Sequence, residues 1–200
     1  MRRLFLVFGS VVVATACGGG GGTTPTPPVA GLRGWSGAVT YSGVVSTQGA
    51  SRTMKWNGNL DWLKITDTSL IPLDAPLPPG AVSYTIKSGS LKLTGSIVAG
   101  GCSGSREIMH QVKAGESYLE VQADGSYIGN LEPTGLFDVP VSCPGGGGSV
   151  PVPFDPSELG SLRISGKLNN ERMKGTMLPP PGAPGTFTGD WDLLALYGAS

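Results

Sequence analysis

Residues 54–62 read MKWNGNLDW, and the period of this stretch indicates the fold class. Every second position is apolar or glycine, and the positions between are charged or carry an amide. Successive side chains of a β-strand point to opposite faces, so this period of two predicts a strand with one face buried and one in water. The predicted buried face carries Met54, Trp56, Gly58, Leu60 and Trp62.

The same period recurs along the chain from Trp35 onward. With 33 glycines, 17 prolines and only 14% charged residues, the composition favours strands joined by turns over helices. No helical pattern of normal length is visible. The pattern predicts about eleven strands, near residues 35–45, 52–66, 81–88, 90–98, 106–113, 117–123, 126–132, 136–142, 160–168, 171–177 and 186–196.

Glycines lie in the middle of six of these strands, where they would only weaken a flat sheet. In a strongly curved sheet they mark the places where the backbone bends. We therefore expect an all-β fold, an antiparallel, mostly up-and-down curved sheet of about 10–11 strands that closes into a barrel or a tight sandwich. The glycines are Gly43, Gly58, Gly95, Gly166, Gly175 and Gly189.

Strict alternation of strand direction predicts that the long connections gather at one end of the sheet. This expectation treats Ser88-Gly89-Ser90 as a hairpin turn. Cys102 and Cys143 then fall at the long-loop end, and we expect them to form a disulfide in an oxidising compartment. The long connections are residues 67–80, 99–105, 143–159 and 178–185.

The first residues are typical of an export signal. Met1-Arg2-Arg3 is cationic, and residues 4–13 form an apolar run interrupted only by Gly9 and Ser10. A membrane-spanning helix needs about 20 apolar residues, so the run is too short to span and has the length of a signal-peptide core. The sequence predicts a signal peptide over residues 1–16 and a single β-domain over residues 31–200.

Residues 14–17, Ala-Thr-Ala-Cys, resemble the lipobox of bacterial lipoproteins, although that family usually has Leu where this chain has Ala14. The resemblance implies that the sulfur of Cys17 receives a diacylglycerol, whose acyl chains are of the palmitate type, and that the chain is then cleaved before Cys17. Gly18 in place of Asp implies sorting to the outer membrane. The alternative is ordinary secretion after the small-x-small site, with Cys17 as a free thiol.

Cysteine pairing and the segment behind Cys17 favour the lipoprotein interpretation. If Cys102 pairs with Cys143, Cys17 is the odd thiol, and a lipidated cysteine has a purpose at an exported N-terminus. Residues 18–28 are five glycines followed by a Thr/Pro run, which makes an extended, flexible tether. We therefore expect residues 17–30 to be a lipidated cysteine and its tether, holding the protein on the cell envelope.

Charge excludes one class of partner. The chain has 14 basic and 14 acidic side chains, and two of the basic ones, Arg2 and Arg3, lie in the leader, which leaves 12 against 14. Binding to nucleic acid requires a basic face, so we expect no nucleic-acid partner. The expected partners are a membrane through the anchor and a protein, a glycan or a small apolar ligand at the long-loop end.

No residue pattern indicates catalysis, a cofactor or a metal. His110 is the only histidine and shares a strand face with Ile108, so we interpret it as structural. We interpret Asp190 and Asp192 as solvated strand positions rather than a glycosidase pair. Trp56, Trp62, Tyr84 and Trp191 are expected to fill the core, with the alternative that some of them line a ligand cavity.

These observations predict a non-enzymatic, lipid-anchored envelope protein whose β-domain acts by binding or by structural contact. A lipocalin-like carrier of a small hydrophobic ligand is the first alternative. An integral outer-membrane barrel is the second, since short turns at one end and long loops at the other also mark that class. An envelope hydrolase is the third, and it would require His110 to cluster with carboxylates.

Overall fold

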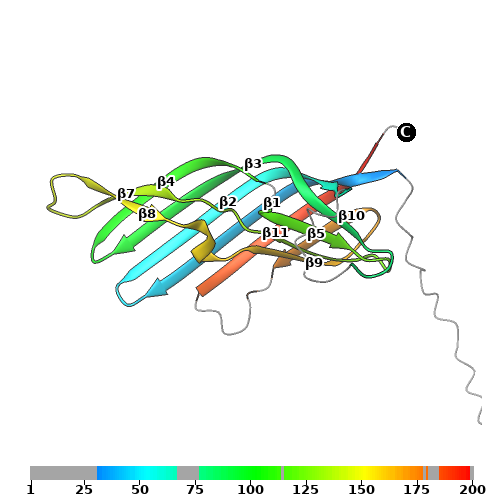
Figure 1. The fold of residues 1–200 in the computed structure, drawn as a ribbon. Coiled ribbons are helices and arrows are strands. Elements are labelled where there is room, and N and C mark those ends of the chain that lie inside the picture. Colours follow the sequence, from blue (N-terminus) through cyan, green and yellow to red (C-terminus); the bar gives the residue numbers. More distant parts are fainter. Residues whose placement is uncertain (1–30, 67–76, 114, 178, 180–184, 199–200) are drawn as a thin grey trace, which may run out of the picture.

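The computed structural model describes residues 31–66, 77–113, 115–177, 179 and 185–198 (Figure 1). These residues form one antiparallel sheet of 11 strands with no α-helix, so the all-β expectation is confirmed. A single turn of 3-10 helix, η2 (Pro156–Leu159), interrupts the strands. The strands are β1 (Leu32–Thr47), β2 (Ala50–Lys64), β3 (Val82–Ala99), β4 (Cys102–Gln111), β5 (Ser117–Val121), β6 (Ser126–Leu131), β7 (Phe137–Ser142), β8 (Ser149–Phe154), β9 (Leu162–Lys167), β10 (Arg172–Met177) and β11 (Gly185–Tyr197).

Four long strands form the frame of the sheet. β1 pairs with β2 on one side and with β11 on the other, so the two ends of the described chain lie in neighbouring strands. β3 follows β2 along its whole length. In all of them alternate residues are buried, as the period of two predicts: Met54, Trp56, Leu60 and Trp62 are buried, while Lys55, Asn57 and Asn59 are exposed.

The predicted strands 81–88 and 90–98 are one continuous strand, β3, and the predicted turn between them is wrong. Gly89 has a φ of 146°, which bends the strand without reversing it. Next to it, Asp61 pairs with Ser88 while Trp62 pairs with Ile86, so Lys87 forms a bulge in β3. β8 is a strand that the sequence analysis assigned to a loop.

Three consecutive crossings of the sheet are each divided into two shorter strands. The first divided crossing consists of β4 and β5, which both pair with β3. In the second, β7 pairs with β4 and β6 pairs with β5. In the third, β8 pairs with β7 and β9 pairs with β6. The interruptions lie next to the bend at Gly89, whose carbonyl accepts a hydrogen bond from Val112. The 11 strands therefore make eight crossings of an up-and-down meander.

The hydrogen-bonded sheet does not close on itself in the described residues. β9 pairs with β6 and β10 pairs with β11, but only the isolated bridge between Asn169 and Arg172 joins β9 to β10. A full ladder across the hairpin of β9 and β10 would set Ile164 opposite Gly175, but no such pair is present among the described residues. Instead, the amide of Arg163 in β9 donates to the Met177 sulfur of β10 across 3.3 Å.

The long connections do not gather at one end of the sheet. Because β3 is unbroken, the connection between β2 and β3 leaves from the end where β1 begins, next to Gly34 and Leu63. The turns after Thr47 and Ala99 and the connection after Ser142 lie at the opposite end. Figure 1 shows this separation, with the start of β1 and the end of β11 at one end and the β7–β8 hairpin extending from the other.

One apolar core lies against the inner face of the sheet. η2 contributes to it: Leu159 is buried, and its carbonyl accepts a hydrogen bond of 2.6 Å from the Tyr41 hydroxyl. A side chain at Gly43 would collide with the same carbonyl, which explains the glycine in the middle of β1. The largest fully buried side chains are Trp35, Trp62, Tyr84, Phe154, Met54, Leu60, Leu91, Leu93, Leu119, Leu131, Leu159 and Leu162.

Candidate functional site

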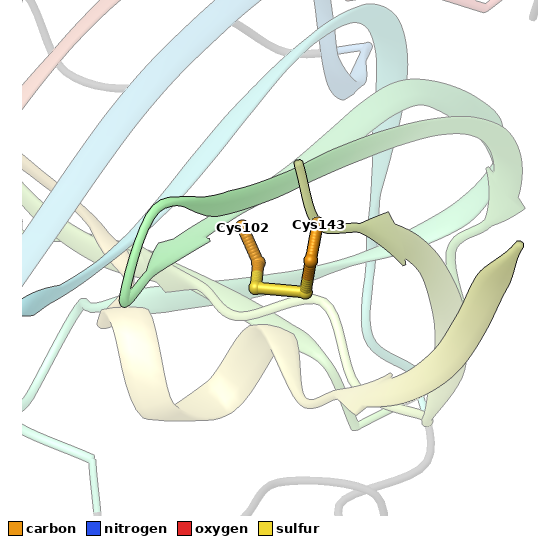
Figure 2. Close-up of a disulfide and its surroundings, with 2 residues drawn as sticks. All are labelled: Cys102 and Cys143. Atoms are coloured by element: carbon orange, nitrogen blue, oxygen red, sulfur yellow. A yellow bond between two sulfur atoms is a disulfide. The ribbon is translucent and has the colours of Figure 1, made fainter. Parts of the chain in front are cut away.

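The predicted disulfide between Cys102 and Cys143 is present (Figure 2). Cys102 begins β4, and Cys143 follows directly after β7. The neighbouring residues Ser103 and Ser142 are paired, which brings the two cysteines to the same end of adjacent strands. The β4–β7 ladder contains only two residue pairs, so the disulfide reinforces the weakest paired contact between neighbouring strands of this region.

The four aromatic candidates for a ligand cavity are buried in the core. Trp56, Trp62, Tyr84 and Trp191 are only 0–3% exposed. Trp56 stacks on Tyr41 with ring centroids 5.1 Å apart, and no partner for the indole N–H of Trp56 or Trp62 lies among the described residues. Apolar contact therefore holds these two indoles, which is the arrangement of side chains that fill a core.

Trp191 has a polar partner that links three strands. Its indole Nε1 donates to the hydroxyl of Tyr127 in β6 across 3.2 Å. That hydroxyl donates in turn to the Lys174 carbonyl of β10 across 3.4 Å. A side chain at Gly175 would collide with the Trp191 ring, so β10 can pass over the indole only because this residue has no side chain.

His110 lies beside a carboxylate that the sequence analysis did not single out. Its Nε2 is 2.8 Å from Oε2 of Glu116, and the two side chains are 11% and 4% exposed. Glu116 also accepts hydrogen bonds from the Lys113 amide at 2.9 Å and from the Thr134 amide and hydroxyl at 3.0 and 2.5 Å. Its carboxylate thus connects the loop between β4 and β5 to the loop between β6 and β7.

Hydrogen bonding decides the charge of Glu116. Burial alone raises the pKa of its carboxyl, but the hydrogen bonds from Thr134, Lys113 and His110 outweigh burial and leave the pKa below its usual value. Each oxygen accepts two hydrogen bonds, so the carboxylate is fully occupied within the protein. This geometry suits a structural joint better than a general base, which must reach a substrate proton.

The sequence contains only a weak signal for this joint. Glu116 lies six residues after His110, too far along one strand to share a contact with it, and the pair meets because a turn separates β4 from β5. Thr134 is further away still. Only the folding of both loops against each other brings the three residues together.

The outer face of β10, β11 and β1 has a shallow depression of about 330 Å³. Asp190 there accepts a hydrogen bond from Thr176, and Asp192 forms ion pairs with Arg172 and Lys174. Hydrogen bonds from Arg172 lower the pKa of Asp192. The two carboxylates therefore serve separate surface contacts, and the lining residues are Ala38, Thr40, Lys174, Gly175, Thr176, Asp190, Trp191 and Asp192.

The remaining observations concern metals, membranes and relatives. Among the residues that the structure describes, no group of three or more His, Cys, Asp or Glu side chains could hold a metal ion. No helix in that part of the chain is long and apolar enough to cross a membrane. Cys17 lies outside the described residues. No protein family, curated protein or solved structure matches the chain.

Proposed function

We propose that this protein is an exported lipoprotein, held on the outer membrane by acyl chains on Cys17, whose β-domain is a non-enzymatic binding or structural module. The observation that carries the proposal is the disulfide between Cys102 and Cys143. Disulfides persist in oxidising compartments outside the cytosol. Pairing of these two cysteines leaves Cys17 alone, directly behind the lipobox-like residues 14–16.

We also propose that the eight crossings form a barrel that is closed by side chains between β9 and β10. Two contacts support closure at this seam: the Arg163 amide meets the Met177 sulfur, and the Tyr127 hydroxyl meets the Lys174 carbonyl. The core aromatic residues then lie inside the barrel. Their burial supports a filled interior over a carrier of small apolar ligands.

The direction of β1 orients the domain on the proposed anchor. The tether joins the sheet at Leu32, and β1 has 16 residues. At about 3.3 Å per residue, the far end of β1 lies about 50 Å from the point where the tether joins. The disulfide and the β7–β8 hairpin are therefore at the distal end of the domain.

The distal end is the proposed contact surface. Residues 46–51, 96–105 and 141–151, which form its turns and adjoining strand ends, contain no charged side chain, and Arg52, directly beside them, forms an ion pair with Glu158. Charged residues are depleted at the centre of protein interfaces, so this composition favours contact with an uncharged partner surface. The proposed partner site is therefore the end that carries the disulfide, where the sequence analysis also expected it.

Intact-mass measurement of the membrane-extracted protein tests the anchor. We expect a chain that begins at Cys17, carries a diacylglycerol and an additional acyl chain, and lacks two hydrogens because of the disulfide. The Cys17→Ser variant is the matched control and should lose both the added mass and the membrane association. A wild-type chain with an unmodified Cys17, recovered from the culture fluid, would contradict the proposal.

A further inference from the structure

β8 (Ser149–Phe154) is the last strand on its side of the sheet. It pairs with β7, and no strand among the described residues pairs with its other edge. Pro151 and Pro153 are exposed, and Val150 is 65% exposed. Unpaired edges of this kind invite pairing with another chain.

The register of the hairpin fixes the direction of the backbone groups of β8. Pro140 of β7 lies opposite Pro151 of β8. Neither residue has an N–H, so this pair cannot exchange the hydrogen bonds of the ladder, and its backbone groups point away from the hairpin. Consistently, the carbonyl of Asp138, two residues before Pro140, accepts a hydrogen bond from the Arg106 side chain of β4.

The alternation of an antiparallel strand extends this direction to the whole of β8. Ser149, Pro151 and Pro153 all direct their backbone groups to the free edge, while Val150 and Val152 face β7. The free edge therefore offers three carbonyl acceptors but only one N–H donor, that of Ser149. Two copies of this edge would place six residues in a shared ladder, three from each copy. Four of these six residues are prolines, which have no N–H group to donate.

Among the described residues, β8 lacks the usual protection of an edge strand. Natural edges are often guarded by charged side chains, bulges or a covering segment. Residues 139–154 contain no charged side chain, and the β7–β8 ladder has no register shift. In the part of the chain that the structure describes, the two prolines are the feature that opposes pairing at this edge.

We propose that Pro151 and Pro153 block strand addition at the β8 edge by a second copy of this chain. The free edge of β8 can then accept single hydrogen bonds at its carbonyl groups, but it cannot form a β-ladder with another strand. The proposal deepens the proposed function and rests on it for its purpose, because copies anchored on one membrane are concentrated at its surface and meet one another often. The physical claim itself concerns the domain in solution.

The test restores the missing donors. Residues 17–200 with Cys17→Ser, which lack the leader and carry no acyl chains, are compared with the same chain carrying Pro151→Thr and Pro153→Thr. We expect the first chain to remain monomeric over a wide range of concentration in sedimentation equilibrium. The double variant should form a species of twice the monomer mass, with its dissociation constant lower by about tenfold or more.

Pro144→Thr is the matched control, because it makes the same replacement in the exposed turn before β8 and should leave the mass unchanged. Circular dichroism and an intact disulfide establish that each variant is folded; if the double variant does not fold, Pro153→Thr alone is measured. A folded variant that stays monomeric overturns the proposal, as does a wild-type edge that already pairs. Failure of the anchor would not change either result.

Discussion

Glu116 lies in the loop of Lys113 and joins it to the loop of Thr134, a residue 18 positions further along the chain. A buried carboxylate is tolerated only when donors replace its lost hydration, and here four donors do so. The main-chain carbonyl of Glu116 also accepts the Glu132 amide at 2.8 Å. Glu116 thus fixes the break between β4 and β5 relative to the break between β6 and β7.

Replacement Glu116→Gln should lower the free energy of unfolding by about 2 kcal/mol. The amide group of glutamine presents hydrogens where the Thr134 or His110 donors now point, so at least one buried donor loses its acceptor. Urea unfolding measures the loss. Glu107→Gln is the control, because Glu107 pairs with Lys92 on the surface with 54% of its side chain exposed, and it should change stability by about 0.5 kcal/mol or less.

The same variant has a defined dependence on pH. The pKa of Glu116 is lowered by folding, so its contribution is present above the ordinary value of 4.5 and is lost as the pH falls through the folded-state value. The stability difference between wild type and Glu116→Gln should therefore be largest near neutral pH and shrink in acid. A difference that grows in acid would contradict this assignment.

At the scale of elements, the β7–β8 hairpin depends on a covalent attachment. Only two residue pairs join β7 to β4, and Pro140 cannot donate a hydrogen bond beyond them. The disulfide between Cys102 and Cys143 lies at the end of this short ladder (Figure 2). The hairpin nonetheless contributes Val139 and Phe154 to the core, so its attachment matters for the whole sheet.

Removal of the disulfide by Cys102→Ser and Cys143→Ser should lower the free energy of unfolding by about 4 kcal/mol for a sequence separation of 41. Hydrogen exchange should locate the effect, because the amides of β7 and β8 should lose protection before those of β1 and β2. Each single serine variant should match the double variant, since either replacement breaks the bond. A uniform loss of protection across all strands would show that the disulfide does not act mainly on the hairpin.

At the scale of the whole molecule, the seam between β9 and β10 is the place where the meander lacks a ladder. The Tyr127 hydroxyl bridges it, accepting from Trp191 and donating to the Lys174 carbonyl. All the remaining pairs of neighbouring crossings are joined by backbone hydrogen bonds, whereas a contact through side chains replaces them at this seam. The seam should therefore be the least stable boundary of the proposed barrel.

Replacement Tyr127→Phe tests the seam. It removes the acceptor of a buried indole N–H and should cost about 1–2 kcal/mol of unfolding free energy. Hydrogen exchange should increase first at residues 163–167 and 172–177. Tyr118→Phe on the neighbouring strand is the control, since Tyr118 faces away from the core, and its effect should be about 0.5 kcal/mol or less.

Parts of the fold were predictable because they depend on local pattern. The period of two in residues 54–62 correctly separated buried from exposed positions, and the pairing of Cys102 with Cys143 was expected from the number of cysteines in an exported chain and from their place at one end of the sheet. The joint at Glu116 was not predictable, because its donors come from two loops whose contact has no sequence period. The burial of His110 was consistent with its predicted structural role, but its partner was missed.

The errors concern glycine and proline. Ser88-Gly89-Ser90 has the composition of a turn, yet the residues continue β3, because β2 pairs with both halves and holds them in line. Residues 149–154 contain two prolines and were assigned to a loop, although prolines are acceptable on an edge strand whose N–H positions face away from the partner. In both places the neighbouring strand decided the structure.

The sequence by itself determined the all-β class and the buried faces of most strands, because side-chain alternation acts over a few neighbouring positions, and the expected export of the chain indicated that Cys102 pairs with Cys143. The tertiary structure alone decided which strands are neighbours, where three crossings break, and why β9 meets β10 without a ladder. Those choices depend on contacts between residues far apart in the chain, such as Tyr127 with Lys174 and Glu116 with Thr134. No local pattern carries that information, because each contact forms only when both segments are already placed.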